Sequence, residues 1–460
     1  MTRRGDGRAR GRDGPERSRA DAGSPDRESR SISRRGFLAA GALGTAGWIG
    51  SSVLPAGADR VLGPGDAIRP DSAARASGGS AAPPGRPVFE PTGAGLPSPL
   101  GTRSSHERPR REVSLPGPSG SSLTPLADLY GIITPSDLHY ERHHSGIPWL
   151  DPENYRLLVH GMVDRPTSFS LADLMRYPSR TVIRFIECGG NGMFGYREPM
   201  PPMTPRRVAG LTSTSQWTGV PLSLLLREVG VRPGAGWFLA EGDDSGHFAR
   251  SIPLAKAHDD AMIVYGQNGE ALRPEQGYPA RLLTPGFEGS ANVKWIRRIE
   301  VSDAPFMTRS ETSEYTDPLP NDTARIFSLV MDASSIITFP AYPVTLPEPG
   351  WWEVSGLAWS GRGKISRVEV TTDGGGTWHR AALETPVLPR CHTRFRFLWK
   401  WTGGEHVLAS RAVDETGYVQ PTRKALEAVR GPATMYHWNN IRAWRVWPDG
   451  GVSFAGGGEL

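Results

Sequence analysis

Cys188 is the side chain whose type and setting point most directly to chemistry. It is one of two cysteines in 460 residues and stands in Arg184-Phe185-Ile186-Glu187-Cys188-Gly189-Gly190-Asn191-Gly192. The run Thr181 to Glu187 predicts a strand that ends at the thiol, and glycines allow a backbone to approach a bulky ligand closely. Because thiolates are soft metal ligands, the segment predicts one sulfur directed at a metal whose other ligands come from a large cofactor. The alternative is a buried cysteine at the end of a strand.

A few other residues carry weaker signals for chemistry. His139, His143 and His144 have helix-like metal spacing, but adjacent histidines in a loop are more often polar surface residues, so a separate zinc site is the weaker interpretation. Cys391 lies beside His392, and we interpret it as structural. The sequence contains no C-x-x-C, C-x-x-C-H, H-E-x-x-H or G-x-x-x-x-G-K-[ST] motif. These absences argue against c-type haem, the commonest zinc sites and a nucleotide-binding P-loop.

The N-terminal region predicts export. Ser33-Arg34-Arg35-Gly36-Phe37-Leu38 leads into an apolar stretch up to Ile49 and a small-residue exit at Ala56-Gly57-Ala58. Together these indicate a twin-arginine signal peptide over residues 1–58, with an extended basic start, and hence a periplasmic or exported protein. An uncleaved membrane anchor is the alternative, although the apolar stretch is short for a span. Twin-arginine substrates are usually exported folded, often around a cofactor, which agrees with the interpretation of Cys188.

Charge and composition limit the possible functions of the chain and indicate where it is folded. Residues 1–35 hold 11 Arg against 6 acidic residues, whereas the remainder balances 42 Lys plus Arg against 42 acids. The positive net charge therefore comes from the tail and does not indicate nucleic-acid binding. Residues 59–123 are rich in Gly, Pro, Ser and Ala and predict a flexible linker. No later segment has the length of a membrane span, and two distant cysteines form no disulfide framework.

Two globular blocks follow, the first over residues 124–318. Ser170-Leu171-Ala172-Asp173 is typical of a capping box, and Pro178 ends that helix. Pro221 opens a second helix, which Gly230 closes after Leu222 to Val229. Strands are expected at Tyr155 to His160, Thr181 to Glu187 and Trp237 to Ala240. Without regular alternation of strand and helix, the pattern favours an α+β fold.

The second block, residues 319–447, predicts short strands separated by turns. Asp373-Gly374-Gly375-Gly376 has the composition of a hairpin turn. The spacing suits an immunoglobulin-like β-sandwich, and we expect residues 448–460 to be a flexible tail. The expected strands are Trp352 to Leu357, Ile365 to Thr371, Arg394 to Lys400 and His406 to Val413.

From about residue 124 onward the chain resembles the sulfite oxidase family. The first block is similar to the molybdopterin domain of this family, and the second block is similar to its immunoglobulin-like dimerisation domain. Within the family the chain most resembles the SoxC group. The members of that group are the molybdenum subunits of periplasmic sulfur-oxidising systems and are often labelled sulfite dehydrogenases. The motifs that carry it, in order, are Tyr140-Glu141-Arg142-His143-His144, Tyr155-Arg156-Leu157, the Cys188 loop, Trp217-Thr218-Gly219-Val220-Pro221-Leu222, Ser251-Ile252-Pro253-Leu254, Tyr265-Gly266-Gln267-Asn268-Gly269, Gly277-Tyr278-Pro279-Ala280-Arg281-Leu282, Pro285-Gly286 and Val293-Lys294-Trp295.

The resemblance assigns roles to individual residues. It implies that Cys188 is the one protein ligand of the molybdenum and that Arg142 faces the substrate anion, a role that a permanently charged, bidentate guanidinium suits. Tyr315, 22 residues beyond Val293, matches the active-site tyrosine. Arg281 and Lys294 match residues that hold the phosphate and pterin of the cofactor. Weaker cofactor contacts are implied for His143, His144, Asp243 and Asp244.

The sequence also departs from the family pattern. Gly192 and Met193 stand where sulfite oxidases usually have arginines, and Gln276 replaces a histidine that often precedes the Gly-Tyr-Pro segment. Without those arginines the wall of the substrate pocket carries less positive charge. The pocket then admits a substrate bulkier than free sulfite, such as sulfur on a carrier protein. The resemblance thus implies a molybdenum-dependent sulfite or sulfur dehydrogenase that passes electrons to a c-type cytochrome. It further implies a homodimer or heteromer. The alternatives are a related molybdenum reductase and a non-catalytic scaffold subunit of a sulfur-oxidation complex.

Overall fold

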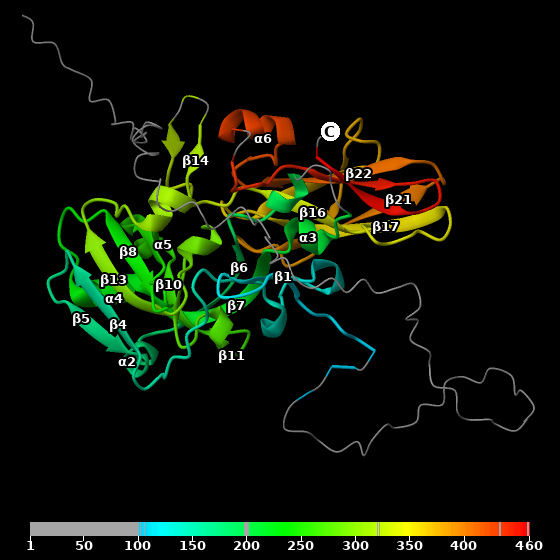
Figure 1. The fold of residues 1–460 in the computed structure, drawn as a ribbon. Coiled ribbons are helices and arrows are strands. Elements are labelled where there is room, and N and C mark those ends of the chain that lie inside the picture. Colours follow the sequence, from blue (N-terminus) through cyan, green and yellow to red (C-terminus); the bar gives the residue numbers. More distant parts are fainter. Residues whose placement is uncertain are drawn as a thin grey trace, which may run out of the picture.

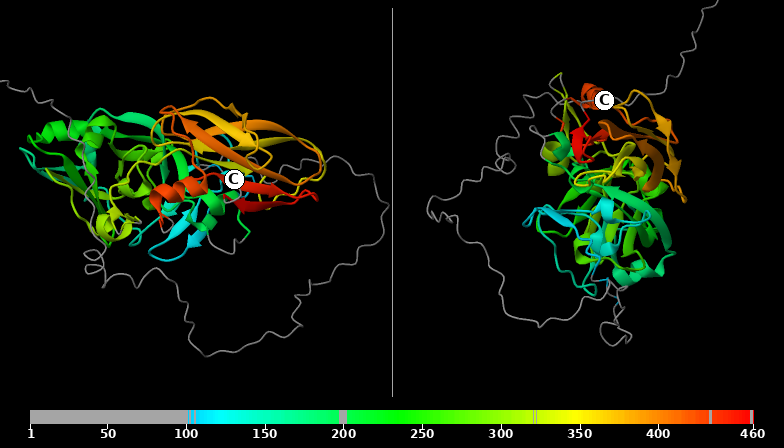
Figure 2. Two further views of the ribbon diagram at one scale, coloured as in Figure 1. Left: turned by 90° about the horizontal axis from the view of Figure 1, so that it is seen from above. Right: turned by 90° about the vertical axis from the view of Figure 1, so that its right-hand side faces the viewer.

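The protein consists of two blocks that lie against each other (Figures 1 and 2). The computed structural model describes residues 101, 103–104, 106–196, 202–319, 321, 323–431, 434–457 and 460. The first block mixes strands with short helices, and the second is built almost entirely of strands. This confirms the expected α+β domain followed by an immunoglobulin-like sandwich. The predicted signal peptide and the predicted linker up to residue 100 lie outside the described residues.

The first block contains three sheets, whose pairings are antiparallel except that of β4 with β13. The small sheet is β1 (Glu112–Leu115), β2 (Ser121–Leu123) and β3 (Glu141–Arg142). The second is β11 (Glu270–Ala271), β10 (Met262–Gln267), β7 (Thr212–Pro221) and β6 (Arg180–Glu187), with β12 (Arg281–Leu283) paired to β10. The third is β5 (Thr167–Ser170), β4 (Arg156–Gly161), β13 (Ile296–Ser302), β8 (Trp237–Gly242) and β9 (Ala249–Pro253).

The helices of this block are short, and two of them begin and end where the sequence predicts. In α2 (Leu171–Arg176) the Ser170 hydroxyl accepts from the Asp173 N–H while the Asp173 carboxylate accepts from the Ser170 N–H, which completes the capping box. Helix α4 (Leu222–Val229) ends at Gly230, whose φ of 71° is left-handed. The other two helices are α3 (Pro205–Ala209) and α5 (Leu254–Asp259).

The second block is a sandwich of two antiparallel sheets. One sheet is β16 (Ser334–Phe339), β17 (Gly350–Trp359), β21 (Thr393–Trp401) and β20 (Ala382–Leu383). The other is β19 (His379–Arg380), β18 (Ile365–Thr371), β22 (His406–Asp414), β23 (Arg442–Val446) and β24 (Val452–Gly456). The small hairpin β14 (Asp317–Pro318) and β15 (Ala324–Arg325) precedes the sandwich, and α6 (Arg423–Arg430) lies between β22 and β23.

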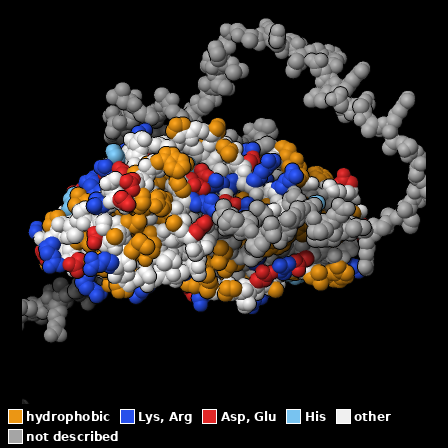
Figure 3. Space-filling model, turned by 90° about the horizontal axis from the view of Figure 1, so that it is seen from below, with side chains coloured by type: hydrophobic (Ala, Val, Ile, Leu, Met, Phe, Trp, Pro, Cys, Tyr) orange, Lys and Arg blue, Asp and Glu red, His pale blue; other side chains and the backbone are white. Residues whose placement is uncertain are grey.

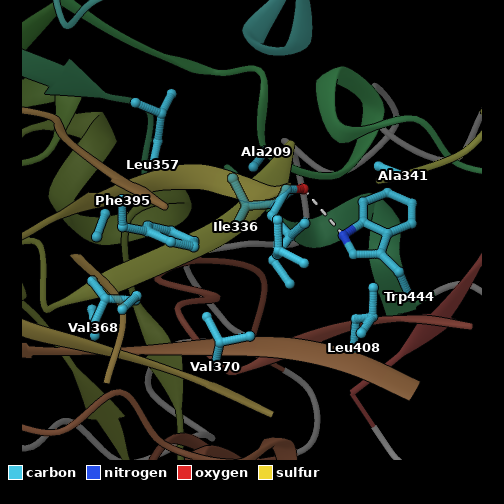
Figure 4. Close-up of a cluster of buried hydrophobic side chains, with 14 of the residues drawn as sticks. Ala209, Ile336, Ala341, Leu357, Val368, Val370, Phe395, Leu408 and Trp444 are labelled. Atoms are coloured by element: carbon cyan, nitrogen blue, oxygen red, sulfur yellow. Dashed lines mark hydrogen bonds between the residues drawn. The ribbon is translucent and has the colours of Figure 1, made fainter. Parts of the chain in front are cut away.

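The core between the two sheets also holds the blocks together. Figure 4 shows part of it, including the fully buried Trp444, whose indole N–H donates to the Ile337 carbonyl oxygen at 3.1 Å. Phe185 of β6 and Val208 of α3 belong to the same buried cluster. Burial of one such side chain contributes about 1.5–3 kcal/mol. The strand that ends at Cys188 is therefore anchored in the core of the second block.

Two segments are more ordered than the sequence indicates. Strands β1 and β2 lie within the expected linker, and β24 lies within the expected tail. The Phe454 ring packs at 5.2 Å on Trp444, and β24 pairs with β23 across a turn at Asp449. The residues that order these segments lie elsewhere in the chain, so the composition of each segment alone does not indicate the order. Composition alone therefore underestimated how far the folded region extends.

The surface and the helices carry two further observations. On the face shown in Figure 3, Lys and Arg side chains are interspersed with Asp, Glu and apolar ones. This agrees with the balanced charge of the chain beyond its basic start. Within the part of the chain that the structure describes, no helix is both long and apolar enough to cross a membrane.

The interface between the blocks contains a buried histidine that predicts pH-dependent stability. His392 is hydrogen-bonded through Nε2 to the Thr212 hydroxyl at 2.9 Å, and burial lowers its pKa to about 3. In the unfolded chain its pKa is about 6.5. Below that pH the unfolded state binds more protons, so the fold loses stability as the pH falls toward 3, by up to about 1.4 kcal/mol per pH unit.

We expect His392→Gln, which keeps a hydrogen-bonding side chain for Thr212, to remove this contribution. Calorimetric unfolding midpoints between pH 7 and pH 5 should then fall less in the variant than in the wild-type protein. The other buried neutral histidines, such as His139, leave part of the pH dependence in place. An equal fall in both proteins would contradict the prediction.

Candidate functional site

A cavity at the carboxyl end of β6 collects nearly all the predicted site residues. The space at the site, open solvent at its mouth included, is about 650 Å³. Loops after β3, β6, β8 and β12 contribute its walls. Eight of the nine predicted residues line it: Arg142, His143, His144, Cys188, Asp244, Arg281, Lys294 and Tyr315.

Asp243 is the ninth residue, and it points elsewhere. Its carboxylate accepts from Arg297 Nη1 at 3.4 Å, outside the cavity. Asp244 is buried instead, and its Oδ1 accepts the Phe248 N–H at 2.8 Å. The chain bends at Asp244, so the two neighbouring carboxylates point in different directions and only that of Asp244 reaches the cavity.

Cys188 presents the only thiol of the cavity. Burial raises its pKa, while Arg142 and the Gly190 N–H, which is hydrogen-bonded to the sulfur, lower it. Gly189 allows the loop to turn here, because a Cβ at this position would lie 2.6 Å from Glu288 Oε2. A thiol with a raised pKa stays protonated by itself, but a bound metal ion would deprotonate it.

The second block holds the loop that carries this thiol. Glu187, next to Cys188, accepts from the indole N–H of Trp359 at 2.7 Å and from Asn191 Nδ2 at 2.8 Å. Asn191 in turn accepts the Leu211 N–H at 3.1 Å. Glu187 and Trp359 are both buried. The orientation of the loop therefore depends on a residue 172 positions away from its glutamate.

Three basic side chains line the cavity: Arg142, Arg281 and Lys294. Arg281 is 3 % exposed, donates to the carbonyl oxygens of Gln276 and Asn292, and has a buried Nε without a hydrogen-bond partner. Lys294 Nζ donates to the carbonyl oxygens of Arg142 and Glu275. Burial, and then the charge of Arg281, lowers the pKa of Lys294 well below its usual value. These carbonyl groups carry no charge, and the nearby Glu141 and Asp244 offset only part of the fall in the pKa of Lys294, so the basic side chains favour an anion.

The histidines of the cavity are neutral and have separate partners. Burial and the nearby Lys294 lower the pKa of His143 to about 4; its Nδ1 lies 2.7 Å from Lys294 Nζ and its Nε2 lies 3.0 Å from Glu141 Oε2. His139 Nδ1 lies near the Tyr140 carbonyl, and its buried Nε2 has no partner. Among the described residues, no group of three or more His, Cys, Asp or Glu is arranged to hold a metal ion. The alternative of a zinc site therefore finds no support.

Tyr315 closes the opposite side of the cavity. It follows the π-helical turn Ser310–Glu314, and its hydroxyl lies 3.0 Å from His144 Nε2. The His144 ring stacks on Phe248 with centroids 4.7 Å apart, and burial, followed by Arg142, lowers its pKa to about 3. Burial and the Cys188 sulfur raise the pKa of Tyr315 well above its usual value. The phenol is therefore a stable hydrogen-bond donor.

Sequence reasoning missed the buried charges behind Tyr315. Arg250 donates from Nη1 to Glu288 Oε1 and from Nε to Glu311 Oε1, each at 2.6 Å, and its Cζ lies 4.4 Å from the centre of the Tyr315 ring. His437 Nε2 joins the chain at 3.1 Å from Glu288 Oε2. All four charged or polar side chains are buried. The one available signal was a charged residue beside the apolar Ser251-Ile252-Pro253-Leu254 segment, but its partners are remote in sequence.

Of the residues at which the sequence departs from the family pattern, one lines the cavity and two do not. Gln276 lines the cavity, and its Nε2 donates to the Tyr140 carbonyl oxygen. Gly192 faces the second block, because a Cβ there would lie 2.7 Å from the Trp438 carbonyl oxygen, and neither it nor Met193 lines the cavity. The cationic character of the cavity therefore comes from Arg142, Arg281 and Lys294.

The residues present suit a molybdenum cofactor. A pterin that carries a phosphate and a dithiolene is an anion, and the buried, unpartnered nitrogen atoms of Arg281 and His139 offer donors to such a ligand. The single thiol suits a metal whose other ligands come from the cofactor itself.

Known proteins resemble this chain over both blocks. Residues 144–310 match the oxidoreductase molybdopterin binding domain, and residues 325–443 match the Mo-co oxidoreductase dimerisation domain. The crystal structure of the sulfane dehydrogenase SoxCD from Paracoccus pantotrophus superposes with a TM-score of 0.74 and 43 % sequence identity. The superposition covers 77 % of this chain and 93 % of that one.

Plant nitrate reductases resemble the chain at lower identity. Nitrate reductase [NADH] 2 of Phaseolus vulgaris is 33 % identical over 348 residues, and nitrate reductase [NADH] of Solanum lycopersicum is 32 % identical over 358. The matches cover 65 % and 66 % of this chain, respectively. The chain spans only 38 % of the length of either protein.

Proposed function

The chain belongs to the sulfite oxidase family of molybdenum-cofactor oxidoreductases and lies close to SoxC within it, and we propose that it is a periplasmic sulfite or sulfur dehydrogenase. In this proposal it oxidises sulfite, or sulfur bound to a carrier protein, and passes the electrons to a c-type cytochrome. The observation that carries the proposal is one cavity in which a single partly buried thiol, three basic side chains and a protonated phenol converge.

Each side chain has a task that its surroundings support. Cys188 would ligate the metal, while Arg281, Lys294 and His143 would hold the phosphate and pterin of the cofactor. When bound, the cofactor supplies the two-electron oxidation and the exchange of an oxygen atom with water. Asp244, held by the Phe248 N–H, and His144 are further contacts within reach of the same cavity.

The substrate is bound by groups of this chain. Arg142 lines the cavity near the thiol and presents a permanent positive charge to a sulfur oxyanion. With the ring proton of the neutral His144 on Nε2, that N–H donates to the phenol oxygen of Tyr315. Tyr315 can then donate its O–H to the same anion, because its raised pKa keeps it protonated at neutral pH. Oxidation of sulfite takes up one water and yields sulfate, two protons and two electrons. The two electrons require an acceptor, and we assign that role to a c-type cytochrome in a homodimeric or heteromeric assembly.

Two alternatives remain as outcomes of the test. A molybdenum reductase of the methionine-sulfoxide type predicts no sandwich domain, and the second block argues against it. A scaffold subunit that has lost its metal predicts that the cavity residues are dispensable. The likeness to nitrate reductases adds nitrate as a substrate to be examined, since nitrate is also an anion.

The decisive experiment uses protein purified from a molybdenum-replete host. We expect about one molybdenum per chain and reduction of cytochrome c with sulfite or with carrier-bound sulfur as electron donor. Thiosulfate, and nitrate with a reduced dye, serve as comparison substrates, and cell fractionation reports whether the protein is periplasmic. Metal-free protein that still supports sulfur oxidation by its partners would favour the scaffold. Rapid reduction of oxygen without cytochrome would contradict the proposed acceptor.

Arg142→Met should weaken substrate binding. Loss of a charge-assisted hydrogen bond costs about 1.5–3 kcal/mol, so KM for sulfite should rise roughly 10-fold to 100-fold. Arg142→Lys keeps the positive charge but loses the bidentate guanidinium, so its KM for sulfite should lie between those of Arg142→Met and the wild-type protein. Steady-state kinetics give the result, with the exposed Arg232→Met as control. An unchanged KM in Arg142→Met would remove this residue from the substrate site.

A further inference from the structure

The segment between α6 and β23 places residues of the second block directly over the cysteine loop. The His437 N–H donates to the Gly189 carbonyl oxygen at 2.7 Å, and His437 Nε2 lies 3.1 Å from Glu288 Oε2. Thr434 donates to Asp317 Oδ1 at 2.6 Å, and Asn439 Nδ2 donates to the Ala333 carbonyl oxygen at 2.9 Å. The segment is thus tied down on both sides of His437.

His437 itself adopts a left-handed backbone conformation, with φ of 59°. Such a conformation is uncommon for a residue other than glycine, and surrounding contacts must hold it. The two contacts of His437, to Gly189 and to Glu288, are of this kind. They determine where the preceding residue, Tyr436, lies.

Tyr436 lies beside Tyr315 at the edge of the cavity, outside the set of residues that line it. The two ring centroids are 5.0 Å apart, and a Cβ at Gly189 would lie 3.5 Å from Tyr436 Cδ1. The side chain is half-buried, whereas Tyr315 is 9 % exposed. Burial and the Cys188 sulfur raise the pKa of Tyr436, and Arg142 lies close enough to act on it in the opposite direction. The phenol therefore stays protonated within range of both the thiol and the substrate arginine.

The hydroxyl groups of the two tyrosines differ in their partners. That of Tyr315 is hydrogen-bonded to His144. That of Tyr436 has no hydrogen bond to any residue in the described ranges. A tyrosine that served packing alone would need no hydroxyl group, and this one packs beside Tyr315, at the edge of a cavity lined by Arg142, Arg281 and Lys294.

We propose that Tyr436 is a substrate-positioning residue, which the second domain adds to the edge of the site beside Tyr315. Its O–H donates to an oxygen atom of the sulfur oxyanion that Arg142 and Tyr315 also bind. An oxyanion with several oxygens accepts from several directions, and Tyr436 supplies a donor on the solvent side. The inference rests on the proposed function and deepens it: the sandwich contributes a side chain to substrate recognition in addition to holding the loop.

Tyr436→Phe removes only the hydroxyl group and tests the proposal. Tyr342→Phe is the matched control, because Tyr342 is a half-buried tyrosine of the same domain that packs on the sandwich core. Three quantities are measured on each purified holoenzyme: kcat and KM for sulfite with cytochrome c, the dissociation constant of sulfate by calorimetry, and molybdenum content. In Tyr436→Phe we expect KM and the sulfate dissociation constant to rise roughly 10-fold, with kcat and molybdenum content unchanged.

Several outcomes would overturn the proposal. Both constants could remain at wild-type values, or Tyr342→Phe could change them equally. A loss of molybdenum together with kcat would show that Tyr436 supports the loop without contacting substrate. If the wild-type protein oxidises no sulfite, the proposed function fails, but the sulfate dissociation constants still decide the role of Tyr436. Failure of the wild-type protein to bind sulfate would overturn that role as well.

Discussion

Cys188→Ser is expected to abolish turnover while leaving the fold intact. Serine has nearly the same shape and its oxygen can accept the Gly190 N–H that the sulfur now accepts. A hydroxyl group, however, is a poor ligand for a soft metal site. Mutation of residues that merely support ligands costs about 10-fold to 100-fold, so loss of the thiol itself should exceed that range. Metal analysis and the visible absorption of the purified variant should show the loss directly.

The other cysteine provides the control for this experiment. Cys391 is 1 % exposed, and burial raises the pKa of its thiol to about 12. Cys391→Ser should retain molybdenum and turnover, because this residue lies in the interface between the blocks and outside the cavity. Unfolding midpoints of both variants should resemble that of the wild-type protein. If Cys188→Ser kept its metal and activity, the thiol would not be the ligand.

Arg250→Met is expected to have the largest effect on stability. Burial alone would raise the pKa of Glu288, but the Arg250 charge outweighs it and lowers that pKa to about 2. This carboxylate therefore contributes stability above its unfolded pKa of about 4.3, and that contribution is lost as the pH falls toward 2. Removal of Arg250 leaves two buried carboxylates without their cation, which costs about 3–5 kcal/mol. The midpoint of thermal unfolding should fall by on the order of 10 °C.

A surface arginine with the same chemical partners isolates the effect of burial. Arg396 also lies between two glutamates, Glu353 and Glu384, but 49 % of its side chain is exposed. Arg396→Met should cost less than about 1 kcal/mol, because water solvates the remaining carboxylates. Calorimetry on the two variants makes the comparison. Equal destabilisation would show that the buried charge chain adds nothing beyond a surface ion pair.

Arg250→Met should also lower kcat. The guanidinium lies 4.4 Å from the centre of the Tyr315 ring and holds that face of the side chain. A methionine leaves the phenol less restrained, and misplacement of a binding group by about 1 Å lowers rates by as much as 100-fold. Kinetics at a temperature well below the unfolding midpoint separate this effect from loss of fold.

Local sequence was sufficient for the elements that deliver the predicted side chains. Ser170 and Asp173 form the expected capping box, and Gly230 ends α4 as predicted. The run before Cys188 is a strand, β6, that ends at Glu187. Each of these features depends on residues within a few positions of one another. Segment composition failed where order depends on remote partners, as in β24, whose Phe454 packs on Trp444.

By itself, the sequence determined the fold class and predicted eight residues that line the cavity, from Arg142 to Tyr315, because their motifs follow one another in a recognisable order. Tertiary structure decided which of Asp243 and Asp244 enters the cavity and that Gly192 faces the second block. It also brought Trp359, Tyr436 and His437 to the cysteine loop from the second domain. These contacts join residues that are distant in sequence, so only the folded chain brings them together. Arg250, for example, becomes part of the site because the fold buries it in ion pairs with Glu288 and Glu311.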